Sequence, residues 1–289
     1  MKLFTGRAEP ETLPANNESH EDELTVSVEE DTAYFAVVTA SDLHIGTRPY
    51  QQDALYVTET ACSDPGTTLK VFGVLCDGMG GMENGEKAGR LTVEQLAKDL
   101  DELDPHSDVP AFFESEVAKL DELVCEEVAG GMKNGTGTTL TAVLIIDKDL
   151  YWAAVGDSRI YILRSNEILQ VTRDHNYMLL LENEVRNGRL LREEAEAHPD
   201  KDALISYIGS GNVRFININR APFRLAHGDV VLQCSDGLTK SLSDDEIKEI
   251  IIDHYGDLAE TARMLTLQAF DAGEGSKDNT SVILMQYFE

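Results

Sequence analysis

Beyond residue 31, short apolar runs of the chain alternate with longer amphipathic blocks. The runs are rich in β-branched and aromatic residues, which predicts β-strands. They are AYFAVVTA, ALYVTE, LKVFGVL, TAVLII, LYWAAV, RIYIL, RFININ, DVVLQC and NTSVILMQYF. Two connections, in IIDKDLYW and in AAVGDSRIYIL, are too short to contain a crossover helix. Parallel neighbours need such a helix, so we expect strands joined by these turns to run antiparallel.

Helical periodicity is confined to a few blocks. Apolar residues recur there at intervals of three and four, as on one face of a helix. The blocks are NGEKAGRLTVEQLAKDL, VPAFFESEVAKLDELVCEEV, SDDEIKEIIIDHY and DLAETARMLTLQAF. In the third block, Ser243 and Glu246 have the spacing of a capping box. Strand runs with clustered helices predict an α+β domain, in which antiparallel sheets pack face to face and helices cover them outside.

Composition along the chain divides it into a tail and one domain. Residues 1–30 mix Pro, Asn, Ser and Glu with few large apolar side chains, which predicts a flexible acidic tail. We expect residues 31–289 to form the domain. Within it, residues 176–212 are polar, lean towards helix and fit a sheet poorly, so we interpret them as an inserted flap.

The charge balance limits the kinds of partner. The chain has 53 acidic and 24 basic residues, for a formal net charge of −29. Nucleic acids and anionic membranes require Lys and Arg, so we expect neither as a partner. A negative field attracts metal ions and basic peptides instead. No run approaches the roughly 18 apolar residues of a spanning helix, and the N-terminus lacks the apolar centre of a secretory signal, so we expect a cytoplasmic location.

The candidate chemistry lies in aspartates that flank apolar runs, each beside a glycine or near a turn. A carboxylate at a strand end is held by the sheet but exposed at its rim, where several strands can bring such groups together. Clustered carboxylates repel one another, and hard cations such as Mg²⁺ or Mn²⁺ offset this repulsion. Asp-Gly is also a common turn dipeptide, so spacing alone does not show that these residues converge. The residues are Asp53, Asp77, Asp157, Asp236 and Asp278.

Other hydrolase and phosphate chemistries lack their motifs. None of the four cysteines is followed by arginine six positions on, so the loop of cysteine-dependent phosphatases is missing. The segment GGMENGEKAG lacks the contiguous Gly-Lys-Ser/Thr of a P-loop, and neither GxSxG nor HExxH occurs. Of the hydrolytic mechanisms compared, attack by water activated by metal ions remains.

Segments from about Ala33 to the C-terminus resemble the PPM family, the type 2C metal-dependent serine/threonine protein phosphatases, in its bacterial form. Each segment alone is a weak signal of the family, but the order and separations of the segments together are specific to it. This resemblance implies a four-layer αββα sandwich, with two antiparallel β-sheets flanked by helices. It also implies a binuclear Mn²⁺ or Mg²⁺ site at one end of the sandwich. The segments are GTRPYQQD, VFGVLCDGMGG, GTGTTLTAV, AAVGDSRIYIL, VTRDHN, LQCSDGL and KDNTSVI.

The resemblance implies a metal-ligand role for five residues. Asp77 would bridge the two metals, and the carbonyl of Gly78 would ligate one of them. Asp236 and Asp278 would complete the ligands of the second metal. Asp157 would join Asp236 at a weaker third site.

The resemblance also implies two catalytic residues. Asp53 would form a hydrogen bond to metal-bound water. Arg48 would hold the substrate phosphate, because a guanidinium fork bonds two phosphate oxygens at once. Two metals that share a water lower its pKa and position it for in-line attack on phosphorus.

Three positions depart from the family pattern. The common Asn-Glu-Asp is Gln51-Gln52-Asp53 here, and Met79 replaces a histidine of eukaryotic members that is a candidate general acid. LISYIGSG replaces the usual LTRALG, which affects substrate contacts near the flap. We expect His175, in TRDHN, to be structural.

The leading hypothesis is a monomeric phosphatase for phosphoserine and phosphothreonine in proteins, which the resemblance suggests opposes a bacterial Ser/Thr kinase. One alternative is a non-catalytic binding or regulatory module that keeps the fold. The joint presence of Asp77, Asp236 and Asp278 argues against it. A second alternative is a phosphatase for small metabolites.

Overall fold

The computed structural model describes residues 34–64, 66–80, 83–128, 136–273 and 277–289. The predicted acidic tail, residues 1–30, lies outside them. Within these ranges, none of the helices combines the length and apolar character needed to cross a membrane.

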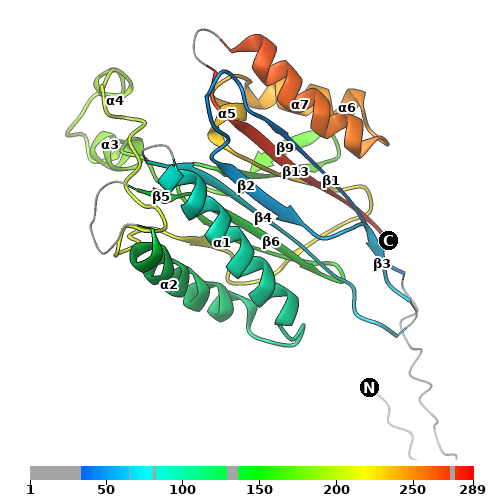
Figure 1. The fold of residues 1–289 in the computed structure, drawn as a ribbon. Coiled ribbons are helices and arrows are strands. Elements are labelled where there is room, and N and C mark those ends of the chain that lie inside the picture. The colour runs from blue at the N-terminus through cyan, green and yellow to red at the C-terminus, as the bar shows by residue number, and fades with distance from the viewer. Residues whose placement is uncertain (1–33, 65, 81–82, 129–135, 274–276) are drawn as a thin grey trace, which may run out of the picture. The chain divides into compact units, whose positions relative to one another are not determined.

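Two antiparallel sheets form the centre of the domain (Figure 1). The six-stranded sheet has the order β3 (Ala61–Cys62), β1 (Ala36–His44), β13 (Thr280–Phe288), β12 (Val230–Cys234), β8 (Arg159–Arg164) and β9 (Glu167–Gln170). The seven-stranded sheet has the order β10 (Asn217–Ile218), β7 (Asp149–Val155), β6 (Leu140–Ile146), β4 (Lys70–Met79) and β2 (Asp53–Val57), with β11 (Phe223–Arg224) paired to β7 and β5 (Gly137–Thr138) paired to β4.

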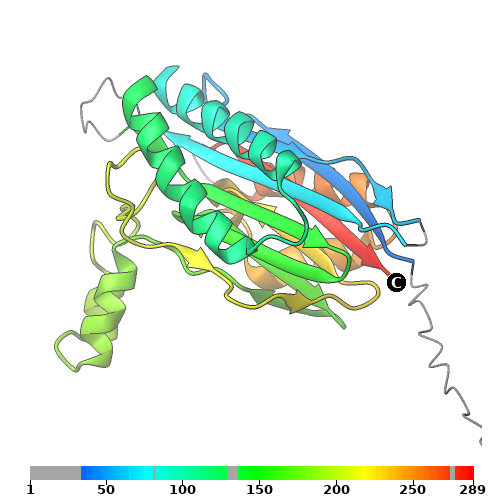
Figure 2. The ribbon, with the colours of Figure 1, turned by 90° about the horizontal axis from the view of Figure 1, so that it is seen from below.

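Helices cover the outer face of each sheet (Figure 2). The helices α1 (Glu83–Glu102) and α2 (Val109–Glu127) share one apolar cluster with β4 and β6 of the seven-stranded sheet. The helices α6 (Asp244–Asp253) and α7 (Leu258–Ala272) share another with β8, β12 and β13. A third cluster fills the space between the sheets. The predicted αββα sandwich is therefore confirmed.

Local sequence signals explain where several helices begin. In the predicted capping box, Ser243 Oγ accepts from the Glu246 N–H at 3.4 Å, and the Ser243 N–H donates to Glu246 Oε2 at 2.8 Å. The side chain of Asp108 likewise caps α2 by accepting from the Ala111 N–H at 3.1 Å. Such caps contribute about 1 kcal/mol each because they satisfy amides that lack a partner within the helix.

One of the two predicted antiparallel connections is confirmed and the other is wrong. The turn in IIDKDLYW joins β6 to β7 as a hairpin, with Ile146 opposite Asp149. By contrast, β7 and β8 lie in different sheets, and the chain crosses between them at Gly156. Gly156 has φ +103°, which favours glycine. A short turn can join stacked sheets as well as paired strands, so its length could not distinguish the two arrangements.

The predicted strand RFININ is also shorter than expected, since only Asn217–Ile218 is paired as β10. The backbone of Phe215 is engaged elsewhere. Its N–H donates to Ser206 Oγ at 3.0 Å, and its carbonyl accepts from the same hydroxyl at 2.9 Å. A side chain thus takes the hydrogen bonds that a longer strand would have used.

The segment 176–212, interpreted from sequence as a flap, contains α3 (Met178–Arg186) and α4 (Arg192–Glu196). Both views show these helices beside the sandwich and not on a sheet face (Figures 1 and 2). A buried carboxylate of α2 holds the end of this segment, because Asp121 Oδ1 accepts from the N–H groups of Gly209 at 2.7 Å and Gly211 at 3.2 Å.

Replacing Asp121 with Ala is expected to lower the free energy of unfolding by roughly 2–3 kcal/mol, because it leaves these amides without their charged acceptor. Asp121→Asn keeps one acceptor oxygen and should retain more than half of that stability. Urea denaturation measures both changes. The matched control is Glu126→Ala, at an exposed position of the same helix. Equal effects of the two alanine variants would contradict this role.

Candidate metal centre

A pocket of about 270 Å³ lies where several strands of both sheets begin or end. Register explains the convergence, since Asp53 at the start of β2 pairs with Asp77 near the end of β4. The pocket brings together Arg48 and the five predicted metal ligands, whereas Asp53 is buried and does not line it. Its lining is Arg48, Gln52, Asp77, Gly78, Met79, Gly80, Thr139, Asp157, Leu204, Asp236, Asp278 and Asn279.

The four lining carboxylates come from different elements. Asp77 belongs to β4, and Asp157 lies in the turn that crosses from β7 to β8. Asp236 begins the short helix α5 (Asp236–Thr239) directly after β12, and Asp278 lies two residues before β13. The crossing between the sheets, which the sequence did not predict, is therefore what brings Asp157 to the pocket.

Gly78 is required by close packing. This Asp-Gly pair lies within β4, so it does not form a turn. An added Cβ would lie 2.2 Å from the Gly85 carbonyl oxygen and 2.7 Å from that of Gln52. Gly80, in contrast, has φ +116°, which favours glycine.

Two threonines hold the backbone of Asp77 in place. The Asp77 N–H donates to Thr139 Oγ1 at 2.9 Å, and the Asp77 carbonyl accepts from the Thr139 N–H at 2.9 Å and from Thr138 Oγ1 at 3.0 Å. Thr139 Oγ1 also lies 2.7 Å from Ser158 Oγ, next to Asp157. The sequence reasoning missed these positioning roles, although the GTGTT segment carried the signal.

Asp53 is buried opposite Asp77 on the neighbouring strand, and its two oxygens have different environments. Its Oδ2 accepts hydrogen bonds from Ser235 Oγ at 2.8 Å and Ser281 Oγ at 2.7 Å. Its Oδ1 is buried and meets no hydrogen-bond donor within the described part of the chain. A buried acceptor without a partner is unfavourable, so Oδ1 needs a further hydrogen-bond donor. Its predicted role stays a prediction.

Two basic side chains pair with the pocket carboxylates. Arg48 donates to Asp278 Oδ2 at 2.9 Å. The ammonium of Lys240 pairs with Asp236 Oδ2 and lies 3.8 Å from Asp278 Oδ2. The second oxygen of Asp236, Oδ1, is buried and lacks a hydrogen-bond partner among the residues described.

Three carboxylates of the site, Asp53, Asp77 and Asp157, have raised pKa values despite these ion pairs. The pKa of Asp53 is raised to about 7, chiefly by burial and in part by Asp236 and Asp278, although the two serine hydrogen bonds lower it. Burial also raises the pKa of Asp157 to about 7, with Asp236 adding to the shift. The pKa of Asp77 is raised well above its ordinary value by burial and then by Asp53. The pocket therefore concentrates negative charge that needs a cation.

The donor set fits hard divalent cations. Carboxylate oxygens and a backbone carbonyl are the ligands that Mg²⁺ and Mn²⁺ prefer. The buried Oδ1 atoms of Asp53 and Asp236 need further partners. In the part of the chain that the structure describes, no three acidic, His or Cys side chains already stand as a ligand group. Because Arg48 pairs with Asp278, we expect a metal bound by Asp278 to displace this contact.

His175 is structural, in keeping with its expected role. It is 3% exposed, and its Nδ1 accepts from the Gly156 N–H at 3.1 Å. Burial lowers the pKa of this imidazole to about 4, so it is neutral near pH 7. His175 thereby fixes the turn that carries Asp157.

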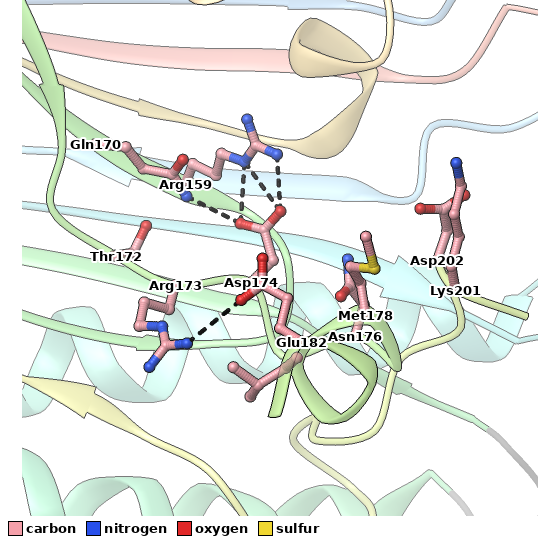
Figure 3. Close-up of a pocket in the computed structure, with 11 residues that line it drawn as sticks. Arg159, Gln170, Thr172, Arg173, Asp174, Asn176, Met178, Glu182, Lys201 and Asp202 are labelled. Atoms are coloured by element: carbon pink, nitrogen blue, oxygen red, sulfur yellow. Dashed lines mark hydrogen bonds and ion pairs between the residues drawn. The ribbon is translucent and has the colours of Figure 1, made fainter. Parts of the chain in front are cut away.

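A second pocket of about 380 Å³ lies beside α3 and is shown in Figure 3. Asp174 occupies its centre and accepts from Arg159 Nε at 3.0 Å and Nη2 at 2.7 Å, and from Gln170 at 3.0 Å. Arg173 extends towards Glu182 of α3. An intermediate pocket of about 310 Å³ shares Asp174 with it and shares Asp157 and Asp236 with the carboxylate pocket. Polar space therefore continues from the carboxylates towards α3.

The raised pKa values predict how the metal-free protein responds to pH. Asp53 and Asp157 bind protons more tightly folded than unfolded, so their stabilising contribution is complete below about pH 4 and is lost as pH rises through about 7. Urea denaturation in EDTA should give a free energy of unfolding that falls by a few kcal/mol between pH 5.5 and 7.5. Added Mn²⁺ should stabilise most at pH 7.5. Asp53→Asn should make the metal-free slope shallower, and an unchanged slope would contradict this assignment.

An αββα sandwich with a carboxylate pocket at its rim defines a candidate metal-dependent phosphatase. The family model for Protein phosphatase 2C matches residues 46–184. Protein phosphatase PhpP of Streptococcus pneumoniae is 34% identical over 226 residues, which is 75% of this chain and 85% of that protein. The chain belongs to the protein phosphatase 2C family.

Solved structures agree with this family. The serine/threonine phosphatase of S. agalactiae superposes with a TM-score of 0.74 at 30% identity, over 88% of this chain and all of that chain. The catalytic domain of the serine/threonine protein phosphatase PstP, solved in complex with two manganese ions, superposes with a TM-score of 0.68 at 28% identity. The superposition with the PstP domain covers 88% of this chain and all of that domain.

Proposed function

We propose that this protein is a serine/threonine protein phosphatase that hydrolyses phosphoserine and phosphothreonine with two Mn²⁺ or Mg²⁺ ions. The observation that carries the proposal is the convergence of Asp77, Asp157, Asp236 and Asp278 with Arg48 on one pocket. The two manganese ions in the related PstP domain support a binuclear site.

Each residue of the pocket then has a chemical task. Asp77 and the Gly78 carbonyl would hold the bound ions, and Asp236 and Asp278 would complete the second ion's protein ligands. When bound, the ions supply an activated water for attack on phosphorus. Asp53 would orient that water by accepting a hydrogen bond at its free Oδ1.

Arg48 is suited to bind the phosphate. Its guanidinium already lies at the pocket, and its side chain is 47% exposed, so it can exchange Asp278 for a substrate oxygen. An arginine fork binds two phosphate oxygens and offsets charge as the bond to the leaving oxygen breaks. Met79 cannot donate a proton, so the leaving group would take its proton from water or from another group.

The net charge of −29 favours substrates whose phosphorylated residue lies among basic residues. The pockets that continue towards α3 provide space for such flanking residues. We further propose a cytoplasmic monomer that opposes a Ser/Thr kinase and binds neither nucleic acid nor membranes, since the charge disfavours polyanions.

Comparing substrate classes tests this proposal. With Mn²⁺ present, a phosphoserine peptide with flanking Arg should be hydrolysed with a far higher kcat/KM than a sugar phosphate, and EDTA should abolish both activities. Raising salt should increase KM for the basic peptide, because it screens the attraction. Preference for the sugar phosphate would favour the metabolite alternative. Metal binding without turnover of any phosphate ester would favour the non-catalytic alternative.

A further inference from the structure

The two oxygens of Asp236 have different surroundings. Oδ1 is buried without a hydrogen-bond partner in the described ranges, whereas Oδ2 is paired with the ammonium of Lys240. The two residues are four positions apart, and Lys240 directly follows α5. Side chains at this spacing lie on the same face of a helical turn. Local helix geometry thus keeps the ammonium near Asp236.

Lys240 lies on the side of Asp236 that faces the intermediate pocket. Asp157 and Asp236 line both the 270 Å³ carboxylate pocket and the 310 Å³ intermediate pocket. Lys240 lines only the intermediate pocket, and Arg48 lines only the carboxylate pocket. The two basic side chains therefore flank the carboxylates from different sides.

The ammonium of Lys240 is the main cation of the intermediate pocket, because the other basic residue that lines it is already paired. Arg159 also lines it, but its guanidinium is held by Asp174 at 2.7–3.2 Å. Asp202 is exposed to solvent at the rim. Among the described cations that line this pocket with Asp157 and Asp236, Lys240 is therefore the one paired with Asp236.

We propose that Lys240 holds its ammonium where a third divalent cation would bridge Asp157 and Asp236, so that this chain favours two metals over three. This inference rests on the proposed binuclear site. A third cation would have to displace the ammonium from Asp236 Oδ2 and would be repelled by its charge. The side chain of Lys240 is 56% exposed, so a third cation can displace it. We therefore expect the third cation to bind more weakly and not to be excluded.

Counting bound metal tests the proposal without measuring catalysis. Free Mn²⁺ is measured by electron paramagnetic resonance during titration of the full chain, for wild type and Lys240→Met. The third equivalent should bind about tenfold or more tightly in Lys240→Met, as expected for removal of one adjacent charge, and the first two equivalents should gain clearly less. Asp157→Asn in the Lys240→Met background should remove this gain.

The matched control is Lys248→Met, because Lys248 pairs with Asp245 on α6 away from the pockets. It should bind Mn²⁺ as wild type does. Equal third-site affinity in wild type and Lys240→Met, or the same gain in Lys248→Met, would overturn the inference and leave the binuclear proposal intact. Weaker binding of the first two equivalents in Lys240→Met would also overturn it. A wild-type protein that binds no Mn²⁺ would remove both proposals.

Discussion

Asp77→Asn should lower kcat for p-nitrophenyl phosphate at saturating Mn²⁺ by three orders of magnitude or more. Removing a single transition-state hydrogen-bond donor already costs about 10²–10³ in kcat, and a bridging carboxylate positions both ions and the attacking water. The substitution preserves side-chain size and the backbone bonds to Thr138 and Thr139. The loss should therefore reflect the charge of Asp77.

Stability separates this effect from misfolding. Burial and neighbouring carboxylates raise the pKa of Asp77, so the neutral amide should make the metal-free protein at least as stable as wild type above pH 7. Urea denaturation in EDTA measures this. The matched control is Asp253→Asn, at an exposed position of α6, which should keep full activity. Retained activity of Asp77→Asn in a chelator would contradict the metal mechanism.

The layered fold could be predicted because its signals are local. Apolar runs specify strands, and caps such as Ser243 specify where helices begin. The assignment of strands to sheets is not local, which is why the step through Gly156 was interpreted as a hairpin although it crosses between sheets. The hydrogen bonds between Ser206 and Phe215 shortened a predicted strand for a similar reason, since the two residues meet only in the folded chain.

The types of residue at the candidate site could be predicted from the sequence, but the residues that hold them in place could not. Aspartates beside glycines at strand ends stand out in a sequence, whereas serines occur everywhere. Ser235 and Ser281, which hold Asp53, therefore gave no signal of their own. Lys240 follows the LQCSDGL segment closely, but only the helical turn of α5 shows that it returns to Asp236.

Arg48→Ala is expected to lower kcat/KM for a phosphopeptide by about 10²-fold or more, because it removes the donor that binds two phosphate oxygens. Arg48→Lys should recover only part of this loss, since a lysine keeps the charge but not the planar fork. Steady-state kinetics at saturating Mn²⁺ measure both variants. The matched control is Arg90→Ala on α1, whose side chain is 62% exposed and lies 4.0 Å from Glu94.

The ion pair between Arg48 and Asp278 gives this prediction a second readout. It is partly exposed, so its loss should change the free energy of unfolding by less than about 1 kcal/mol. Asp278 would also lose a competitor for its Oδ2, so Mn²⁺ should bind Arg48→Ala as tightly as wild type or more tightly. A substrate role therefore predicts lost turnover with retained metal binding. Parallel loss of Mn²⁺ affinity and turnover would instead show that Arg48 supports the carboxylates and does not bind the phosphate.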